Sequence, residues 1–175
     1  MIGGMNAHNP NTTAETETWL TPPHVLDALG PFDFDPCAGP APRPWPTAAR
    51  MISRPDDGLA HEWQGRVWLN PPYGRAVGAW LARLAEHGTG TALLFARTDV
   101  AWFAEHVWPR ASALLFLRGR LKFHRADGSM TTGAANAGAP SVLIAYGPAD
   151  AARLRTSGLL GTYVDATGWR CERAA

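Results

Sequence analysis

Three continuous apolar runs constrain the fold of this chain more than any other feature of its sequence. Residues 91–96, 113–117 and 141–146 are almost entirely apolar, and runs of this length are typical of strands buried on both faces. Apolar residues within 77–84 recur three and four positions apart, which predicts an amphipathic helix ending at Gly88. Strands that alternate with such helices indicate an α/β fold, with a mainly parallel sheet covered by helices on both faces.

Capping and turn signals predict the remaining elements around these runs. Thr21 followed by Pro22 is typical of a helix start, with a capping hydroxyl and a proline in the first turn. Asp99 can cap a second helix in the same way. The other expected elements are a helix end at Gly30, strands at 32–35 and 66–69, a loop with one short strand or helical turn over 38–56, a helix over 100–107 closed by Pro109, an extended ribbon over 119–124, a loop over 126–139, and a weak helix over 149–156 followed by irregular sequence.

Length and composition limit the class of protein. The chain has 175 residues, 46% of them hydrophobic, which suits one domain with a substantial core and is too short for two. Residues 1–18 lack periodicity and are expected to form a flexible tail, so the single domain spans 19–175. A net charge of +1 neither requires nor excludes nucleic acid as a partner.

The cysteines and the apolar pattern limit the cellular setting. Cys37 and Cys171 lack Cys-x-x-Cys spacing, so neither zinc nor thioredoxin-like chemistry is indicated, and we expect no metal site. The sequence has no secretion-signal pattern and no apolar run of about 18 residues. We therefore expect a soluble cytoplasmic protein with reduced thiols and no membrane partner.

Two polar motifs follow strands of the predicted sheet. Asp35-Pro36-Cys37-Ala38 comes after the strand at 32–35, and Asn70-Pro71-Pro72-Tyr73 comes after the strand at 66–69. In open α/β sheets, ligands bind beyond the carboxyl ends of the strands, where the strand order reverses. If the two strands are neighbours, the two motifs line one crevice and form one site.

The second motif suits a planar group that bears an exocyclic amine. Asn70 offers one acceptor and two donors, Pro71 and Pro72 offer carbonyls without N–H donors beside them, and Tyr73 offers a flat apolar face. The amide oxygen and a proline carbonyl can accept both amine hydrogens, which would expose the nitrogen lone pair for attack on an electrophile. The alternative is a proline-rich surface turn, because prolines and aromatics also suit ordinary turns.

Five groups of residues occur in an order that identifies a family. They are Trp19-Leu20-Thr21-Pro22, Phe32-Asp33-Phe34-Asp35-Pro36-Cys37-Ala38, Asp57-Gly58-Leu59 before Trp63, Asn70-Pro71-Pro72-Tyr73, and Gly119-Arg120-Leu121 with Phe123. In this order they resemble the small phage-type DNA N6-adenine methyltransferases, the Dam family. The resemblance covers residues from about 19 to about 146. It implies a Rossmann-like methyltransferase fold, with seven strands in its full form and one of them antiparallel. The segment from 38 to 66 is too short for two strand-helix units, so we expect a sheet trimmed at that edge.

The resemblance implies S-adenosylmethionine as the cofactor and assigns residues to it. Asp35, Pro36, Cys37 and Ala38 resemble the loop that approaches the methionine part, with Asp35 holding its amino group directly or through water. Asp57 resembles the acid that accepts from the cofactor adenine amine, although a plain Asp-Gly turn uses the same residues. Thr21 and Pro22 resemble the segment over the cofactor carboxylate, and helix capping is their other role. The chain lacks the Gly-x-Gly of many methyltransferases. We interpret Cys37 as a packing residue and not a nucleophile, because no base is near it in the pattern.

A basic ribbon is the candidate contact surface for DNA. Arg118, Arg120 and Lys122 alternate with apolar residues ahead of the 126–139 loop, and such a ribbon can follow phosphates. A charged, solvated edge strand would give the same pattern. Arg97, at the end of the 91–96 strand, can face the crevice.

The resemblance implies a site-specific DNA adenine methyltransferase that is encoded by a phage or prophage and acts in a bacterial host. In this reading Asn70, Pro71, Pro72 and Tyr73 are catalytic, and the target adenine must be flipped out of the duplex to reach them. Two alternatives remain. One is a methyltransferase of another amine or amide, in a protein glutamine or in RNA. The other is a nucleic-acid-binding relative that has lost catalysis, a reading that the intact Asn-Pro-Pro-Tyr opposes and the missing Gly-x-Gly leaves open.

Overall fold

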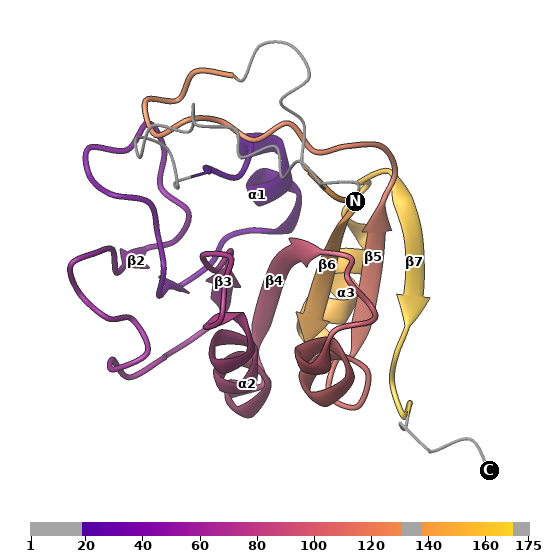
Figure 1. Cartoon of the computed structure of the whole chain (residues 1–175). Coiled ribbons are helices and arrows are strands. Elements are labelled where there is room, and N and C mark those ends of the chain that lie inside the picture. Colours follow the sequence, from indigo (N-terminus) through magenta and orange to yellow (C-terminus); the bar gives the residue numbers. More distant parts are fainter. Residues whose placement is uncertain (1–18, 131–137, 170–175) are drawn as a thin grey trace, which may run out of the picture.

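A computed structural model describes residues 19–130 and 138–169 of the chain (Figure 1). The predicted tail at 1–18 and the centre of the predicted 126–139 loop lie outside the described residues. The elements follow in the order α1 (Pro23–Leu29), β1 (Phe34–Asp35), β2 (Arg50–Met51), β3 (Val67–Leu69), α2 (Val77–His87), β4 (Gly90–Phe95), the π-helix η1 (Phe103–Val107), β5 (Ala113–Leu117), β6 (Ser141–Tyr146), α3 (Pro148–Thr156) and β7 (Gly161–Asp165).

The strands form one seven-stranded mixed sheet in the order β2-β1-β3-β4-β6-β5-β7. β2, β1, β3 and β4 pair in parallel. β6 lies between β4 and β5 and is antiparallel to both, and β7 is antiparallel to β5. The expectation of a mainly parallel sheet therefore holds only for β2, β1, β3 and β4, because every pairing beyond β4 is antiparallel.

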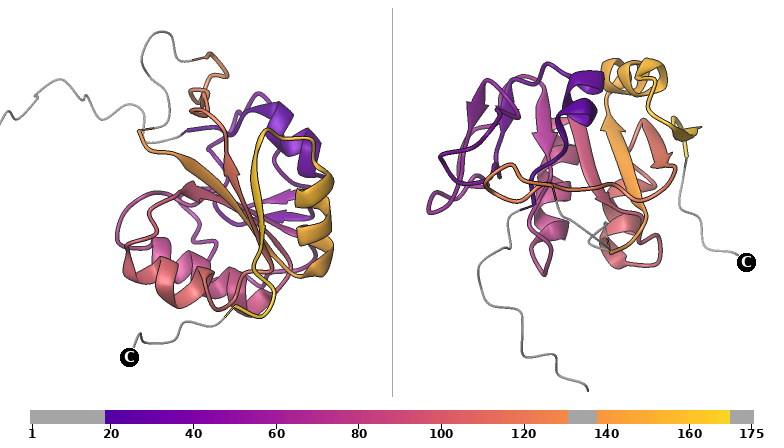
Figure 2. Two further views of the ribbon diagram at one scale, coloured as in Figure 1. Left: turned by 90° about the vertical axis from the view of Figure 1, so that its right-hand side faces the viewer. Right: turned by 90° about the horizontal axis from the view of Figure 1, so that it is seen from above.

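The central strands are apolar throughout because both of their faces are buried. Ala92 and Leu94 of β4 belong to one hydrophobic cluster and Leu93 to a second one, as expected when alternate side chains point to opposite faces. Side chains of α2 and η1 join the first cluster, and side chains of α1 and α3 join the second. Figure 2 shows these two pairs of helices on opposite sides of the sheet.

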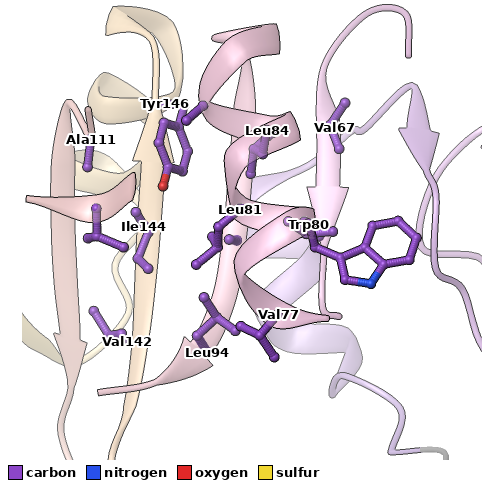
Figure 3. Packing of buried hydrophobic residues seen from close by; sticks show 14 of the residues in the cluster. Val67, Val77, Trp80, Leu81, Leu84, Leu94, Ala111, Val142, Ile144 and Tyr146 are labelled. Atoms are coloured by element: carbon purple, nitrogen blue, oxygen red, sulfur yellow. The ribbon is translucent and has the colours of Figure 1, made fainter. Parts of the chain in front are cut away.

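The helix predicted from the 77–84 pattern packs as its periodicity requires. Leu81 and Leu84 of α2 are fully buried, and Figure 3 shows them beside Ile144 and Tyr146 of β6. α2 ends at Gly88, which adopts a left-handed backbone conformation with φ of 75°. The predicted helix and its glycine stop are thus confirmed.

Several local predictions are wrong. The segment after residue 156 is not irregular, because residues 161–165 form the edge strand β7. The 100–107 segment contains a π-helix instead of a regular α-helix, and no side chain caps it, so Asp99 does not have the predicted role. Thr21 does not cap α1 either, since the N-cap is Pro22 and makes no side-chain bond. The extended ribbon at 119–124 is not a strand and has only isolated bridges at His124.

The edge of the sheet beyond β3 is short. β1 and β2 have two residues each, and no helix separates β2 from β3. At the opposite end of β3 from the candidate site, the Arg66 guanidinium donates through Nε to Asp150 Oδ1 of α3 at 2.7 Å. Thr91 of β4 donates to the same oxygen at 2.9 Å. These bonds tie three elements together at the amino ends of the parallel strands and leave their carboxyl ends free for a site.

None of the described helices has the length and apolar character needed to cross a membrane. Within the described ranges, no three His, Cys, Asp or Glu side chains gather as metal ligands.

Candidate active site

The two polar motifs lie at one cavity, because the strands that carry them are neighbours. β1 and β3 pair in parallel, with Phe34 opposite Val67, so both motifs leave the same edge of the sheet. The cavity there has a volume of about 1170 Å³, which exceeds the usual range for a single small ligand. Its lining includes most of the predicted site residues, namely Thr21, Asp35, Pro36, Cys37, Ala38, Asp57, Asn70, Pro71, Pro72, Tyr73 and Arg97.

Asp35 organises the loop after β1 from inside the cavity wall. Its side chain is buried, with Oδ1 accepting from the Cys37 backbone N–H at 2.9 Å and Oδ2 accepting from the Thr47 hydroxyl. Burial raises the pKa of Asp35 from 3.8 to about 6, and the hydrogen bonds from Thr47 and Cys37 only partly oppose this. Each carboxylate oxygen can accept a further bond, so Asp35 can still meet a cationic group in the cavity when ionised.

Cys37 joins the two motifs and is not an activated thiol. Burial, and then the charge of Asp35, raise the pKa of its thiol well above the ordinary value, while a hydrogen bond from the Asn70 backbone opposes the shift. A thiol with a raised pKa remains protonated and is a poor nucleophile. This environment agrees with the interpretation of Cys37 as a packing residue.

Asp57 forms the second wall of the cavity through a tight turn. Its Oδ1 accepts from the Leu59 backbone N–H at 3.0 Å, which is the Asp-Gly turn role. A Cβ on Gly58 would lie 1.8 Å from the carbonyl oxygen of Pro36, so only glycine allows this turn to meet the loop after β1. Asp57 is exposed at the cavity, and within the described chain its Oδ2 receives no hydrogen bond.

The Asn70 side chain has one defined orientation. Its Nδ2 donates to the Trp19 carbonyl at 3.3 Å and to the Thr21 hydroxyl oxygen at 3.3 Å. A backbone carbonyl only accepts, so the amide atom that faces Trp19 must be the NH₂ group. Both N–H hydrogens are therefore used, and the acceptor Oδ1 is the group that Asn70 has left for a ligand. None of the described residues donates a hydrogen bond to the Pro71 carbonyl beside it.

Tyr73 stands at the cavity with one face covered. Its ring stacks on Phe95, the last residue of β4, with a centroid distance of 4.3 Å and an interplanar angle of 15°. The side chain is nevertheless 45% exposed. Desolvation raises the pKa of its hydroxyl, while a hydrogen bond with the Phe95 backbone and, to a smaller extent, the charge of Arg97 oppose this shift. Tyr73 thus offers an apolar face and a neutral hydroxyl.

The basic residues divide into two groups. Arg97 lines the cavity, whereas Arg118, Arg120 and Lys122 are exposed outside it. Leu121 and Phe123, on either side of Lys122, are buried and anchor the segment, and Phe123 reaches the cavity wall. The alternating basic and apolar residues of this segment therefore alternate between exposed and buried positions, although the segment is not a strand. Pro22 does not line the cavity and serves as the N-cap of α1.

Sequence reasoning missed two residues that line the cavity, Thr47 and Phe95, and one that supports its wall, Trp45. Thr47 holds Asp35, Trp45 donates through its indole N–H to the Thr21 carbonyl at 3.1 Å, and Phe95 supports Tyr73. Thr47 and Trp45 lie in a proline-rich stretch without periodicity, where no local pattern distinguishes them. Phe95 could have been found, because it ends an apolar strand at the edge where ligands bind.

Fold and site together define an α/β protein whose ligand cavity lies beyond the carboxyl ends of neighbouring parallel strands and carries an Asn-Pro-Pro-Tyr motif. The family model described as DNA N-6-adenine-methyltransferase (Dam) matches residues 9–158, so the chain belongs to the Dam family. This confirms the resemblance found in the motifs. Membership implies methylation of the N6 amine of adenine, with DNA as the substrate. Neither a curated protein nor a solved structure matches the chain.

Proposed function

We propose that this protein transfers a methyl group from S-adenosylmethionine to the N6 amine of a flipped adenine at specific sites in DNA, with Asn70, Pro71, Pro72 and Tyr73 as its catalytic residues. The observation that carries this proposal is the Asn70 amide. Both of its N–H hydrogens bond to the protein, so only its oxygen remains for a ligand. That oxygen recognises a hydrogen-bond donor, which an exocyclic amine is.

The chemistry at the amine follows from two acceptors. Asn70 Oδ1 and the Pro71 carbonyl would each accept one amine hydrogen, which localises the lone pair on the nitrogen. The carbonyl is available because no described residue donates to it. No charged base is needed at this step if the proton leaves after methylation, and alignment with preorganised dipoles can supply most of the rate enhancement.

The cavity fits the cofactor as well as a base. Its volume of about 1170 Å³ exceeds that of most single-ligand sites. Asp35 can accept from the cofactor amino group, Asp57 Oδ2 from its adenine amine, and Pro36, Cys37 and Ala38 line the same wall. Thr21 lines the same cavity and would contact the cofactor carboxylate, and Pro22 follows it as the N-cap of α1. When bound, S-adenosylmethionine supplies an electrophilic methyl group on its sulfonium. The seven-stranded sheet with β6 between β4 and β5 is compatible with a Rossmann-like methyltransferase fold.

Access to an adenine requires base flipping, since the amine of a stacked base cannot enter a cavity behind Tyr73 and Asn70. Flipping costs a few kcal/mol, and stacking on Tyr73 offsets part of this cost. Arg97 at the cavity, and Arg118, Arg120 and Lys122 outside it, would contact phosphates on either side of the flipped nucleotide.

Methyl transfer with tritiated S-adenosylmethionine tests the proposal. The full-length protein is incubated with unmethylated DNA, with RNA and with protein extract, and the labelled products are digested and separated. N6-methyladenine in the DNA digest supports the proposal. Label found only in RNA or in protein, or no label in any substrate, would contradict it.

A further inference from the structure

Thr21 lies where the first described segment of the chain, residues 19–22, contacts the Asn-Pro-Pro-Tyr motif. Its side chain is 2% exposed, and its hydroxyl is not used for helix capping. In the described part of the chain, the partner of this hydroxyl is Asn70 Nδ2, at 3.3 Å. Thr21, which has the local sequence pattern of a helix cap, is thus bonded to the side chain of Asn70, 49 positions away.

The backbone around Thr21 is held from two directions. Leu20 donates to the His124 carbonyl at 2.9 Å and accepts from the His124 N–H at 3.0 Å. Trp45 donates through Nε1 to the Thr21 carbonyl at 3.1 Å. Because these bonds do not involve the Thr21 side chain, a substitution there can remove the hydroxyl without releasing the segment.

We propose that Thr21 is a positioning residue, whose hydroxyl oxygen fixes the Asn70 amide with Oδ1 towards the target amine. The catalytic meaning of this role rests on the proposed function, but the geometric role does not. Nδ2 has two hydrogens and two acceptors. The Trp19 carbonyl sets which end of the amide faces inwards, and the Thr21 oxygen holds the second hydrogen, so that the amide plane cannot rotate.

Removal of the hydroxyl leaves one hydrogen of Nδ2 without an acceptor in a partly buried place. The amide then gains by turning towards water or another acceptor, and Oδ1 leaves its defined position. Misplacement of a reacting group by about 1 Å can cost on the order of 100-fold in rate. Thr21→Val keeps the shape of the side chain and removes the acceptor, whereas Thr21→Ser keeps the acceptor and removes only a methyl group.

The test observes the Asn70 amide directly in the ligand-free protein by ¹H–¹⁵N NMR. The two Nδ2 proton signals are assigned by their loss in Asn70→Ala. In Thr21→Val we expect both signals to move, because the released amide no longer holds one orientation, with the larger upfield shift for the proton that was bonded to Thr21. In Thr21→Ser both signals should stay near their wild-type positions. Unchanged signals in Thr21→Val would overturn the proposal, and backbone signals away from the site report whether the variant is folded. If Thr21→Val does not fold, Thr21→Ala replaces it and the same two outcomes apply.

A second measurement separates positioning from a contact with the cofactor alone. Positioning predicts that Thr21→Val lowers kcat for methyl transfer by about tenfold or more, with recovery in Thr21→Ser. If Thr21→Val instead weakens binding of S-adenosylhomocysteine in calorimetry but leaves kcat and the amide signals unchanged, Thr21 acts on the cofactor only and the proposal is wrong. The amide signals need no turnover, so failure of the proposed function and failure of this inference are distinguishable.

Discussion

Tyr73 and Phe95 stack face to face, with ring centroids 4.3 Å apart and planes inclined by 15°. Phe95 ends the parallel strand β4, whereas Tyr73 belongs to the motif after β3. The strand therefore supports one face of the tyrosine ring, and the ring remains 45% exposed at the cavity. A rigid aromatic platform of this kind suits a planar ligand, because stacking needs the ring face and no particular polar group.

Substitution of Tyr73 should separate its ring from its hydroxyl. Tyr73→Phe keeps the ring face and should retain most activity, whereas Tyr73→Ala should weaken binding of the flipped base by roughly 1–3 kcal/mol. The fluorescence of 2-aminopurine at the target position of a DNA duplex reports flipping. Its rise on binding should be near normal for Tyr73→Phe and smaller for Tyr73→Ala. Equal loss of activity in both variants would show that the hydroxyl has a chemical role.

Asp35 should give the folded protein a distinct pH dependence. Its folded pKa is raised from 3.8 to about 6 by burial, so the folded state binds the proton more tightly than the unfolded state. The contribution of Asp35 to stability is therefore complete below about pH 4 and is lost as the pH rises through about 6, a total of about 3 kcal/mol.

Urea unfolding of the wild type and of Asp35→Asn at pH 4, 5.5 and 7 measures this contribution. The free energy of unfolding of the wild type should fall relative to the variant across this range, since other titrating groups cancel in the difference. A constant difference between pH 4 and pH 7 would mean that Asp35 titrates at its ordinary pKa.

Regular local patterns made part of the fold predictable. α2 follows from its helical spacing, and β4 and β6 follow from apolar runs, because these elements are buried in the way their patterns imply. β7 escaped prediction since its residues are mostly exposed or half-buried. Its existence depends on pairing with β5, which is a tertiary relationship and not a local one.

The candidate site was predictable where a motif lies at a strand end, as for Asp35 and Asn70. It was not predictable where a single residue acts across the chain. Thr47 reaches Asp35 from an irregular segment, and Thr21 bonds to Asn70 instead of capping α1. A threonine before a proline has the same local signature in both roles, so only the folded arrangement distinguishes them.

Gly58 should be essential for the shape of the cavity. Gly58→Ala would place a Cβ 1.8 Å from the Pro36 carbonyl oxygen, which forces the turn of Asp57 away from the loop after β1. We expect a loss of stability of about 1–3 kcal/mol and a clear loss of affinity for S-adenosylhomocysteine in calorimetry.

Gly78→Ala is the matched control for this substitution. It lies in α2, where a Cβ would meet only the Cβ of Trp102, at 3.5 Å, and alanine favours the helix by roughly 1 kcal/mol. This variant should keep its affinity and be at least as stable as the wild type. Similar stability and affinity in the two variants would show that the close contact between Gly58 and Pro36 does not determine the shape of the cavity.

The exposed basic segment should contribute to DNA affinity through phosphates. Replacing Arg120 and Lys122 together with alanine should lower the slope of log affinity against log salt by about 1.8, that is, about 0.9 for each lost phosphate contact. Affinity for S-adenosylhomocysteine should not change, because both residues lie outside the cavity. Replacing Arg153 and Arg155 of α3 with alanine removes the same charge elsewhere and should leave the slope unaltered. An unaltered slope in the Arg120 and Lys122 double variant would show that these residues do not contact phosphates and only keep the surface soluble.

The most direct test compares the wild type with Asn70→Ala in methyl transfer to unmethylated DNA under single-turnover conditions, with N6-methyladenine measured after digestion. Asn70 Oδ1 should act on the amine mainly as it becomes nucleophilic, so its loss should appear in the rate and not in binding. We predict that the rate of N6-methyladenine formation falls by about 100-fold or more, while affinities for DNA and for S-adenosylhomocysteine change little. Formation of N6-methyladenine at the wild-type rate in Asn70→Ala would contradict the account.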